Sequence, residues 1–234
     1  MEFIRKIVVL AFSLLLPFNL NVEFPIDFKK IDYKEIVDIV VGSQVNSEYV
    51  NVARNEFNNQ DIVGRLYIES IDIDVPLVQT EDNEYYLNHD VYKNFDSVGS
   101  IFLDYRNNID LDKKILIYGH NSKNIQTEFK KLENFLNFDF FNNLDNRKLI
   151  LESNNKISYY EISNVVITVS DFQHMKLAFT KDEWNDHIDW LNKSSLYQST
   201  LDYDDEILIM QTCYYEPDDS YLLIIAKKIE EELY

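Results

Sequence analysis

Cys213 is the one cysteine in a chain of 234 residues, and it stands at the end of an apolar run. The run reads EILIMQTC over 206–213, and the composition of 214–219 after it is typical of a turn. A second apolar run, 221–226, follows. This pattern predicts a buried strand with the thiol at its C-terminal end, where the adjoining loop leaves the thiol accessible to substrate. The alternative is a small buried core cysteine, because free cysteines are usually buried.

A thiol needs a partner for this chemistry, because the thiolate is the nucleophile and a thiol at neutral pH is mostly protonated. The chain has four histidines, and one of them, His120, follows the apolar run 113–118 in the sequence GHNS. If the strands before His120 and Cys213 are sheet neighbours running the same way, their side chains can meet. Otherwise His120 is a loop histidine that bonds to nearby backbone. The sequence lacks spaced ligand pairs such as CxxC or HxxxH, so we expect no metal and no cofactor.

Residues 1–22 begin with Arg5 and Lys6 and continue with an apolar run over 7–18. A basic start before an apolar run is typical of an export signal or a signal-anchor. We predict an uncleaved anchor, because 18–23 reads FNLNVE and lacks small residues for a peptidase; the alternative is a buried N-terminal helix. The positive-inside preference then places the rest of the chain outside the cell membrane. In that oxidising compartment a lone cysteine is either an intermolecular disulfide or a free reactive thiol.

The composition narrows the range of partners. The chain carries 41 acidic and 22 basic residues, which gives a net charge of −19. Binding to nucleic acid or to anionic lipid needs clustered Lys and Arg, so this charge argues against both for the folded domain. The hydrophobic fraction of 46% supports a sizeable core.

The elements that must position the thiol and the imidazole come from the apolar patterns. We divide the chain into an anchor (1–22), a stem of short helices (23–60) and a β-rich domain (61–234). Expected strands are 62–69, 71–78, 99–104, 113–118, 148–152, 156–170 and the two runs that flank 214–219. Expected helices are 49–57, 127–141 and 180–196. About eight short strands at this spacing suggest a small closed barrel or sandwich with helical insertions.

Four motifs, in this fixed order along the chain, resemble the sortase family. They are DNEYYLNH at 82–89, GSIFLDYRN at 99–107, YGHNS at 118–122, and TC at 212–213 before a hydrophobic strand that ends AKK at 226–228. The first two, and the long helix 180–196, are similar to class B sortases. The resemblance covers about residues 61–228. It implies a mainly β fold, an eight-stranded sortase-type barrel with N-terminal helices and a long helix inserted between late strands.

The resemblance implies a membrane-anchored cysteine transpeptidase on the outer face of a Gram-positive cell membrane. Such enzymes cut a cell-wall sorting signal, hold the protein as a thioacyl enzyme and pass it to an amine of a peptidoglycan precursor. Cys213 matches the nucleophile, and His120 matches the acid that protonates the departing amine. The residues that we assign to peptide binding are Asn83, Leu87, Gln211 and Thr212. For Leu87 the alternative is core packing.

One position departs from the family pattern. Sortases carry an arginine on the last strand that steadies the substrate carbonyl and the oxyanion, and here that position holds Tyr221. A tyrosine hydroxyl donates one hydrogen bond but lacks the charge and fork of a guanidinium. Loss of one oxyanion donor typically costs about 10²–10³ in rate. Two rivals therefore stay open: a degenerate sortase-like protein that binds a sorting signal without turnover, and a thiol protease that hydrolyses it.

Overall fold

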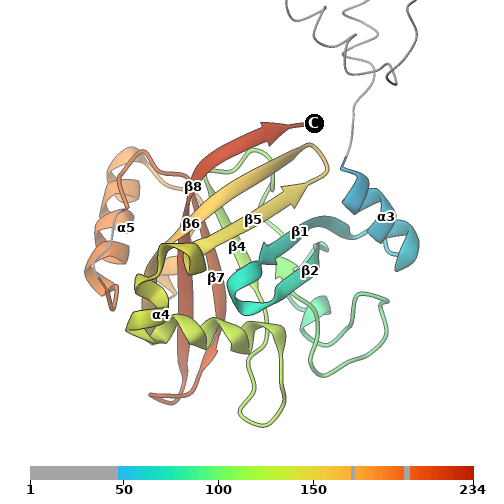
Figure 1. Ribbon diagram of the computed structural model, residues 1–234, viewed down its shortest axis with the longest axis horizontal. Coiled ribbons are helices and arrows are strands. Elements are labelled where there is room, and N and C mark those ends of the chain that lie inside the picture. The colour runs from blue at the N-terminus through green and yellow to red at the C-terminus, as the bar shows by residue number, and fades with distance from the viewer. Residues whose placement is uncertain (1–46, 170–171, 198–200) are drawn as a thin grey trace, which may run out of the picture. The chain divides into compact units, whose positions relative to one another are not determined.

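The computed structural model describes residues 47–169, 172–197 and 201–234. Within them, eight strands close into a barrel in the order β1-β2-β3-β4-β7-β8-β6-β5 (Figure 1). The strands are β1 Ile62–Ile68, β2 Ile73–Val78, β3 Phe102–Leu103, β4 Lys114–Tyr118, β5 Lys148–Ser153, β6 Lys156–Val169, β7 Ile207–Tyr214 and β8 Ser220–Leu233. The predicted mainly β, eight-stranded barrel is confirmed.

Short helices connect the strands and cover the barrel. The α-helices are α3 Glu48–Glu56, α4 Phe138–Asn142 and α5 Lys181–Ser194; the 3-10 helices are Glu69–Ile71, Tyr85–Leu87, Glu128–Leu136, Leu144–Arg147 and Gln173–Met175. A capping box begins α5, because the Thr180 hydroxyl accepts from the Glu183 amide while the Glu183 carboxylate accepts from the Thr180 amide. The prediction of one helix over 127–141 was wrong. Asn137 is extended there and its side chain caps α4, which divides the segment in two.

The strand pair β4–β7 is the part of the barrel that positions the predicted thiol. These two strands are parallel and pair in register from Lys114 with Ile207 to Tyr118 with Gln211. On its other side β7 is antiparallel to β8, and Cys213 pairs with Tyr221. The sequence-based condition that the two strands be neighbours running the same way is therefore met.

Side-chain alternation gives β7 two different faces. Leu208 and Met210 belong to an apolar cluster to which all eight strands contribute, so this cluster is the barrel interior. Ile207 and Ile209 instead pack into a second cluster with Leu191 of α5. Figure 1 shows α5 on the outside of the barrel. Each fully buried Leu or Ile contributes about 1.5–3 kcal/mol. Packing on both faces therefore holds β7 rigidly, and Cys213 continues the face that α5 covers.

The N-terminal predictions fall mostly beyond the described part of the chain. The expected anchor (1–22) and most of the expected stem (23–46) lie outside the described residues. The stem helix expected at 49–57 is present as α3, and Arg54 from it donates to the Ile62 carbonyl at 2.7 Å. Among the helices that are described, none combines the length and the apolar composition needed to span a membrane.

Candidate active site

Cys213 lies on the outer face of the barrel, one residue before the end of β7. Its side chain is half-buried, and the thiol is free. Burial raises the pKa of the Cys213 thiol, because the thiolate loses solvation in this position. The thiol is therefore mostly protonated at neutral pH. It needs a proton acceptor or a stabilising cation before it can attack a carbonyl carbon.

His120 follows β4 by two residues, and the pairing with β7 continues towards it. The Gly119 amide donates to the Gln211 carbonyl at 3.2 Å, and the Thr212 hydroxyl donates to the Gly119 carbonyl at 2.7 Å. Extending the parallel register of β4 and β7 by two residues places His120 beside Cys213. Strand alternation also places both on the outer face, since Tyr118 and Gln211 are paired on that face. The imidazole and the thiol, 93 positions apart in the chain, thus come from neighbouring strands.

The imidazole of His120 rests on a backbone carbonyl from another loop. Its Nε2 lies 2.7 Å from the carbonyl oxygen of Leu87, in the 3-10 turn Tyr85–Leu87. The ring also borders a cavity of about 210 Å³ that Ser100 and Phe129 help to line. Sequence reasoning named Leu87 for its side chain, which is 39% exposed, and missed its carbonyl. No pattern of residue types marks a backbone carbonyl for this role.

Tyr221 stands directly opposite Cys213 in the β7–β8 register. Its ring lies 5.9 Å from that of Phe172 and 6.1 Å from that of His174. The described arginines are bonded to other parts of the barrel: Arg54 to Ile62, Arg65 to Asp74, Arg106 to Asp104 and Arg147 to Glu161. Within the described residues, then, no guanidinium replaces the missing arginine at this position.

The two residues before Cys213 face opposite sides of β7. Gln211 lies on the face of the thiol, and its Oε1 is 2.6 Å from Nε2 of His174. Thr212 is 2% exposed, faces the barrel interior and holds the strand that leads to His120 through its hydroxyl. The structure therefore brings Gln211 to the thiol and gives Thr212 a bond that positions the backbone.

Asn83 is held on the loop that carries Leu87. Its Nδ2 donates to Asp104 Oδ2 at 3.0 Å, and its Oδ1 accepts from the Tyr105 amide at 2.9 Å. The partner Asp104 is fully buried, and although burial would raise its pKa, the bonds from Arg106 and Tyr118 lower it. Asn83 is thus fixed near Leu87 by a charged network.

The loop after Cys213 is tied to the loop after His120, a contact that sequence reasoning missed. Tyr215 donates its hydroxyl to the Asn121 carbonyl at 2.8 Å. Lys123 lies 3.3 Å from Asp218 and sits over the Tyr215 ring at 4.8 Å. Burial and the neighbouring Cys213 raise the pKa of Tyr215, which keeps this hydroxyl protonated as a donor. The two loops that follow Cys213 and His120 are therefore bonded to each other.

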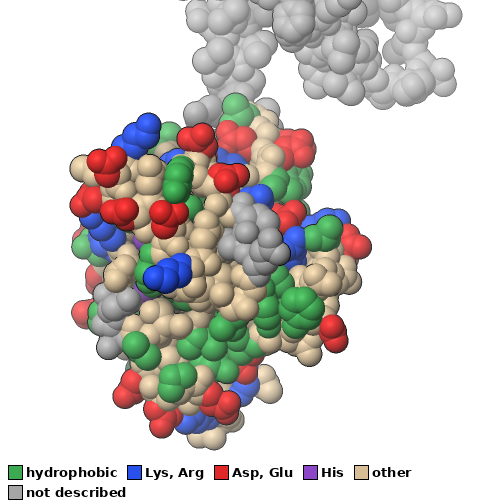
Figure 2. Space-filling model, turned by 90° about the vertical axis from the view of Figure 1, so that its left-hand side faces the viewer, with side chains coloured by type: hydrophobic (Ala, Val, Ile, Leu, Met, Phe, Trp, Pro, Cys, Tyr) green, Lys and Arg blue, Asp and Glu red, His purple; other side chains and the backbone are tan. Residues whose placement is uncertain are grey.

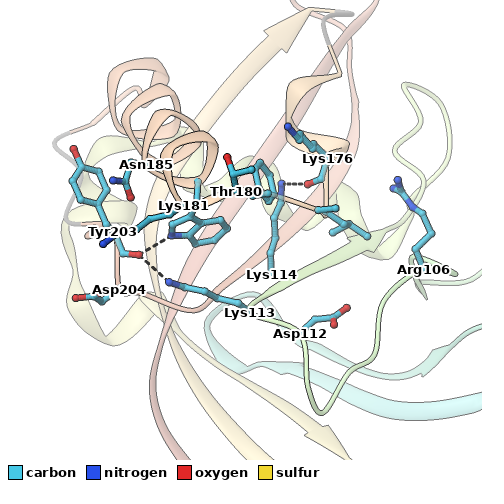
Figure 3. Close-up of a pocket in the computed structure, with 14 residues that line it drawn as sticks. Arg106, Asp112, Lys113, Lys114, Lys176, Thr180, Lys181, Asn185, Tyr203 and Asp204 are labelled. Atoms are coloured by element: carbon cyan, nitrogen blue, oxygen red, sulfur yellow. Dashed lines mark hydrogen bonds between the residues drawn. The ribbon is translucent and has the colours of Figure 1, made fainter.

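The opposite end of the β4–β7 pair carries a larger cavity of about 1200 Å³, and Figure 3 shows the residues that line it. Neither Cys213 nor His120 lines this cavity. Lys114 Nζ lies 2.8 Å from the carbonyls of His174 and Lys176 and 2.9 Å from Nε2 of His187. Burial holds the pKa of Lys114 well below its ordinary range, and burial and then Lys114 lower the pKa of His187 to about 3. These groups are bonded to one another, so we assign them a structural role.

The surface that carries α5 is shown in Figure 2. Acidic side chains spread toward the edges of this face, hydrophobic side chains gather nearer its middle, and Lys and Arg are scattered. Among the described residues, three or more His, Cys, Asp or Glu side chains do not come together as metal ligands. The chemistry that this arrangement supports is acyl transfer, with a thiol as nucleophile and an imidazole as proton donor and acceptor.

Comparison with known proteins gives matches along most of the chain. A family model, the sortase domain, matches residues 66–229. The chain is 34% identical over 197 residues to Sortase B of Listeria monocytogenes, covering 82% of this chain and 77% of that protein. The structure of Clostridium perfringens sortase B has a TM-score of 0.69 at 31% identity, over 77% of this chain and 99% of that chain. The Staphylococcus aureus sortase B–substrate complex, at 21% identity, is alike in fold, with a TM-score of 0.71 over 84% and 91%.

Proposed function

Because the chain belongs to the sortase family, in its class B, we propose that Cys213 cleaves a sorting-signal peptide and transfers the upstream part to an amine. The family membership implies a cysteine transpeptidase; turnover by this chain, its substrate, the intermediate and the cellular location are the proposal. The observation that supports it is the parallel pairing of β4 and β7, whose register, continued by two residues, would bring His120 opposite the half-buried thiol of Cys213.

The reaction that we propose has two halves. The Cys213 thiolate attacks the carbonyl carbon of the scissile peptide bond, a C–S bond forms, and the C–N bond breaks. His120 in its cationic form gives a proton to the departing nitrogen. An acceptor amine then attacks the thioester and gives a proton back to His120, and the thiolate leaves. Burial favours the neutral thiol, so a minor fraction of the enzyme carries the reactive charge pair at neutral pH.

The proposed reaction needs two partners, a sorting-signal peptide and an acceptor amine. Staphylococcus aureus sortase B has been solved with substrate, and a sortase B has been solved in complex with triglycine. By analogy, the sorting signal would lie along the outer face, between the loop of Asn83 and Leu87 and the end of β7. The acceptor would be an amine of a peptidoglycan precursor. We place the protein on the outer face of the cell membrane, held by residues 1–22, because Arg5 and Lys6 precede an apolar run there.

Tyr221 supports a second candidate function, a degenerate sortase-like protein that binds a sorting signal with weak or no turnover. The position opposite Cys213 offers a phenol in place of a guanidinium, and a phenol donates one hydrogen bond without a positive charge. On this reading the peptide binds but the oxyanion is poorly stabilised, which lowers the rate about 10²–10³-fold.

One assay separates these functions. The full chain is incubated with a peptide library, with and without an added amine, and the products are measured by mass spectrometry. Cleavage with transfer to the amine supports the transpeptidase, and cleavage to free acid whether or not amine is present supports a hydrolytic thiol protease. Peptide binding with neither cleavage nor a thioacyl adduct on Cys213 would leave the degenerate binding protein.

A further inference from the structure

The hydrogen bond between His120 and Leu87 determines which ring nitrogen carries the proton. Nε2 of His120 lies 2.7 Å from the Leu87 carbonyl oxygen, and a carbonyl can only accept. Nε2 must therefore be the donor, both when the imidazole is neutral and when it is charged. In the neutral ring the lone pair is then on Nδ1, so Nδ1 is the nitrogen that can exchange a proton with a substrate.

The position of the Leu87 carbonyl depends on Gly99. A Cβ on Gly99 would lie 2.7 Å from the Leu87 oxygen and 2.4 Å from the Tyr86 oxygen, closer than real contacts allow. Gly99 also has a φ of +65°, in the left-handed region that favours glycine. Next to it, the Ser100 amide donates to the Tyr86 carbonyl at 2.9 Å. The backbone at 99–100 thus packs directly against the turn that holds His120.

The space behind the ring makes this support necessary. His120, Gly99 and Ser100 all line the cavity of about 210 Å³. A ring that lost its bond to Leu87 would have room to rotate into that cavity, which Cys213 does not line. A displacement of about 1 Å at a reacting group can cost about 10²-fold in rate.

We propose that the Leu87 carbonyl, kept in place by the side-chain-free Gly99, holds His120 as the Nε2–H tautomer and assigns proton transfer to Nδ1. During acylation the proton of Nδ1 passes to the departing nitrogen as the C–S bond forms and the C–N bond breaks. Nε2–H stays bonded to Leu87 throughout. Gly99 is thereby a positioning residue. The catalytic part rests on the proposed function, whereas the tautomer does not.

The tautomer can be measured without any substrate. The full chain, with its four histidines labelled with 15N, is studied by NMR above about pH 7.5, where an ordinary imidazole is neutral. His120→Ala assigns the His120 signals. We expect a protonated Nε2 and an unprotonated Nδ1. A protonated Nδ1 in the wild-type chain would overturn the proposal, whether or not the protein proves to be an active transpeptidase.

Gly99→Ala tests the positioning role, with Gly64→Ala as the matched control. A Cβ on Gly64 would lie 2.4 Å from the Glu152 oxygen, an equally tight site in β1, away from His120. Gly99→Ala should lower kcat for cleavage about 10²-fold with KM changed less than about twofold, and should mix the His120 tautomers. Gly64→Ala should leave kcat and the His120 tautomer unchanged. The positioning role of Gly99 would be refuted if the 15N signals of His120 were unaltered in Gly99→Ala, or if the two variants lost kcat equally.

A milder variant covers the case in which Gly99→Ala does not fold. Ser100→Ala removes a hydroxyl that donates to the His89 carbonyl at 3.0 Å, two residues beyond Leu87. We expect a smaller decrease in kcat than in Gly99→Ala and a smaller fraction of the second His120 tautomer. A Ser100→Ala chain with wild-type tautomer and kcat would count against a positioning role for this segment.

Discussion

The two ends of the β4–β7 strand pair carry similar kinds of side chain but differ in how completely these are bonded. At one end, Lys114 and His187 are 3% and 6% exposed, and the lysine nitrogen has three hydrogen-bond partners. At the other end, Cys213 is half-buried beside the loop of His120, whose Nε2 bonds to one carbonyl. Both ends lie on the outer face of the barrel, under or beside the segment 172–180.

This difference separates a structural cluster from a reactive one. Buried polar groups are normally fully hydrogen-bonded, and a group bonded in this way has nothing left to offer a substrate. The Lys114 end borders the larger cavity and still serves to hold the segment Gln173–Met175 against β4. The Cys213 end keeps a free thiol and a ring nitrogen for chemistry. The larger cavity therefore lies at the end whose polar side chains are bonded to one another.

The largest effect should come from Cys213→Ala. Removing the nucleophile should lower peptide cleavage about 10⁴-fold or more, with no thioacyl adduct by mass spectrometry. Unfolding by denaturant should be nearly unchanged, because a half-buried thiol contributes little packing. Cleavage that persists in the folded variant would exclude Cys213 as the nucleophile.

His120→Ala should have the next largest effect, since it removes the proposed proton donor. We expect a loss of about 10²–10⁴-fold in kcat for cleavage. His187→Ala is the control from the other end of the strand pair: it should lower the free energy of unfolding and leave kcat within about threefold. If the two histidine variants lost activity equally, the distinction between the two ends would fail.

Tyr221→Arg tests whether the position opposite Cys213 limits the rate. A guanidinium there would supply a charged fork to the oxyanion, and kcat should rise by up to about 10²–10³-fold. Tyr221→Phe is the matched control, and its kcat should fall if the hydroxyl is a weak substitute. Unchanged rates in both variants would place the oxyanion away from Tyr221.

The family, most of the strands and the candidate residues were predictable from the sequence, because each leaves a pattern in a short stretch of residues. Apolar runs lead up to His120 and Cys213, and four motifs pointed to the sortases, two of them together with the long helix to class B. The family match confirms the family, and the sortase B relatives confirm the class. Strand periodicity, visible in the order of side-chain types, predicted the strands but left a barrel or a sandwich open, and the resemblance to sortases pointed to the barrel. The roles of Cys213, His120 and Tyr221 stay predictions that await the assays above.

What the sequence did not predict depends on backbone groups and on register. The bond from His120 to Leu87 uses a carbonyl, which every residue carries. Thr212 stands next to Cys213 in sequence, yet strand alternation turns it into the barrel, away from the peptide face. The burial of Lys114 was not predicted either: lysine is rarely buried unless its nitrogen is paired, and the carbonyls that pair with it come from a distant part of the chain.

The pH dependence of the thiol gives a smaller, graded effect. Burial raises the pKa of Cys213 above an ordinary value of 9.0, so only a small fraction of the native thiol is thiolate at neutral pH. The rate of alkylation by iodoacetamide should rise about tenfold per pH unit through the neutral range. At any fixed neutral pH it should be slower in the native chain than in denaturant. A native midpoint below pH 9.0 would mean that the thiolate is stabilised, for example by a charged His120.

The smallest effect on chemistry should come from Lys114→Met, which alters the other end of the strand pair. The substitution removes the donor to the His174 and Lys176 carbonyls and leaves two buried acceptors without it. Such groups cost about 1–3 kcal/mol each, so the free energy of unfolding should fall by about 2–6 kcal/mol in urea titration. The alkylation rate of Cys213 should stay within about twofold, because the thiol lies at the far end of β7. A large change in thiol reactivity with an unaltered free energy of unfolding would reverse the assignment, making Lys114 part of the reactive site.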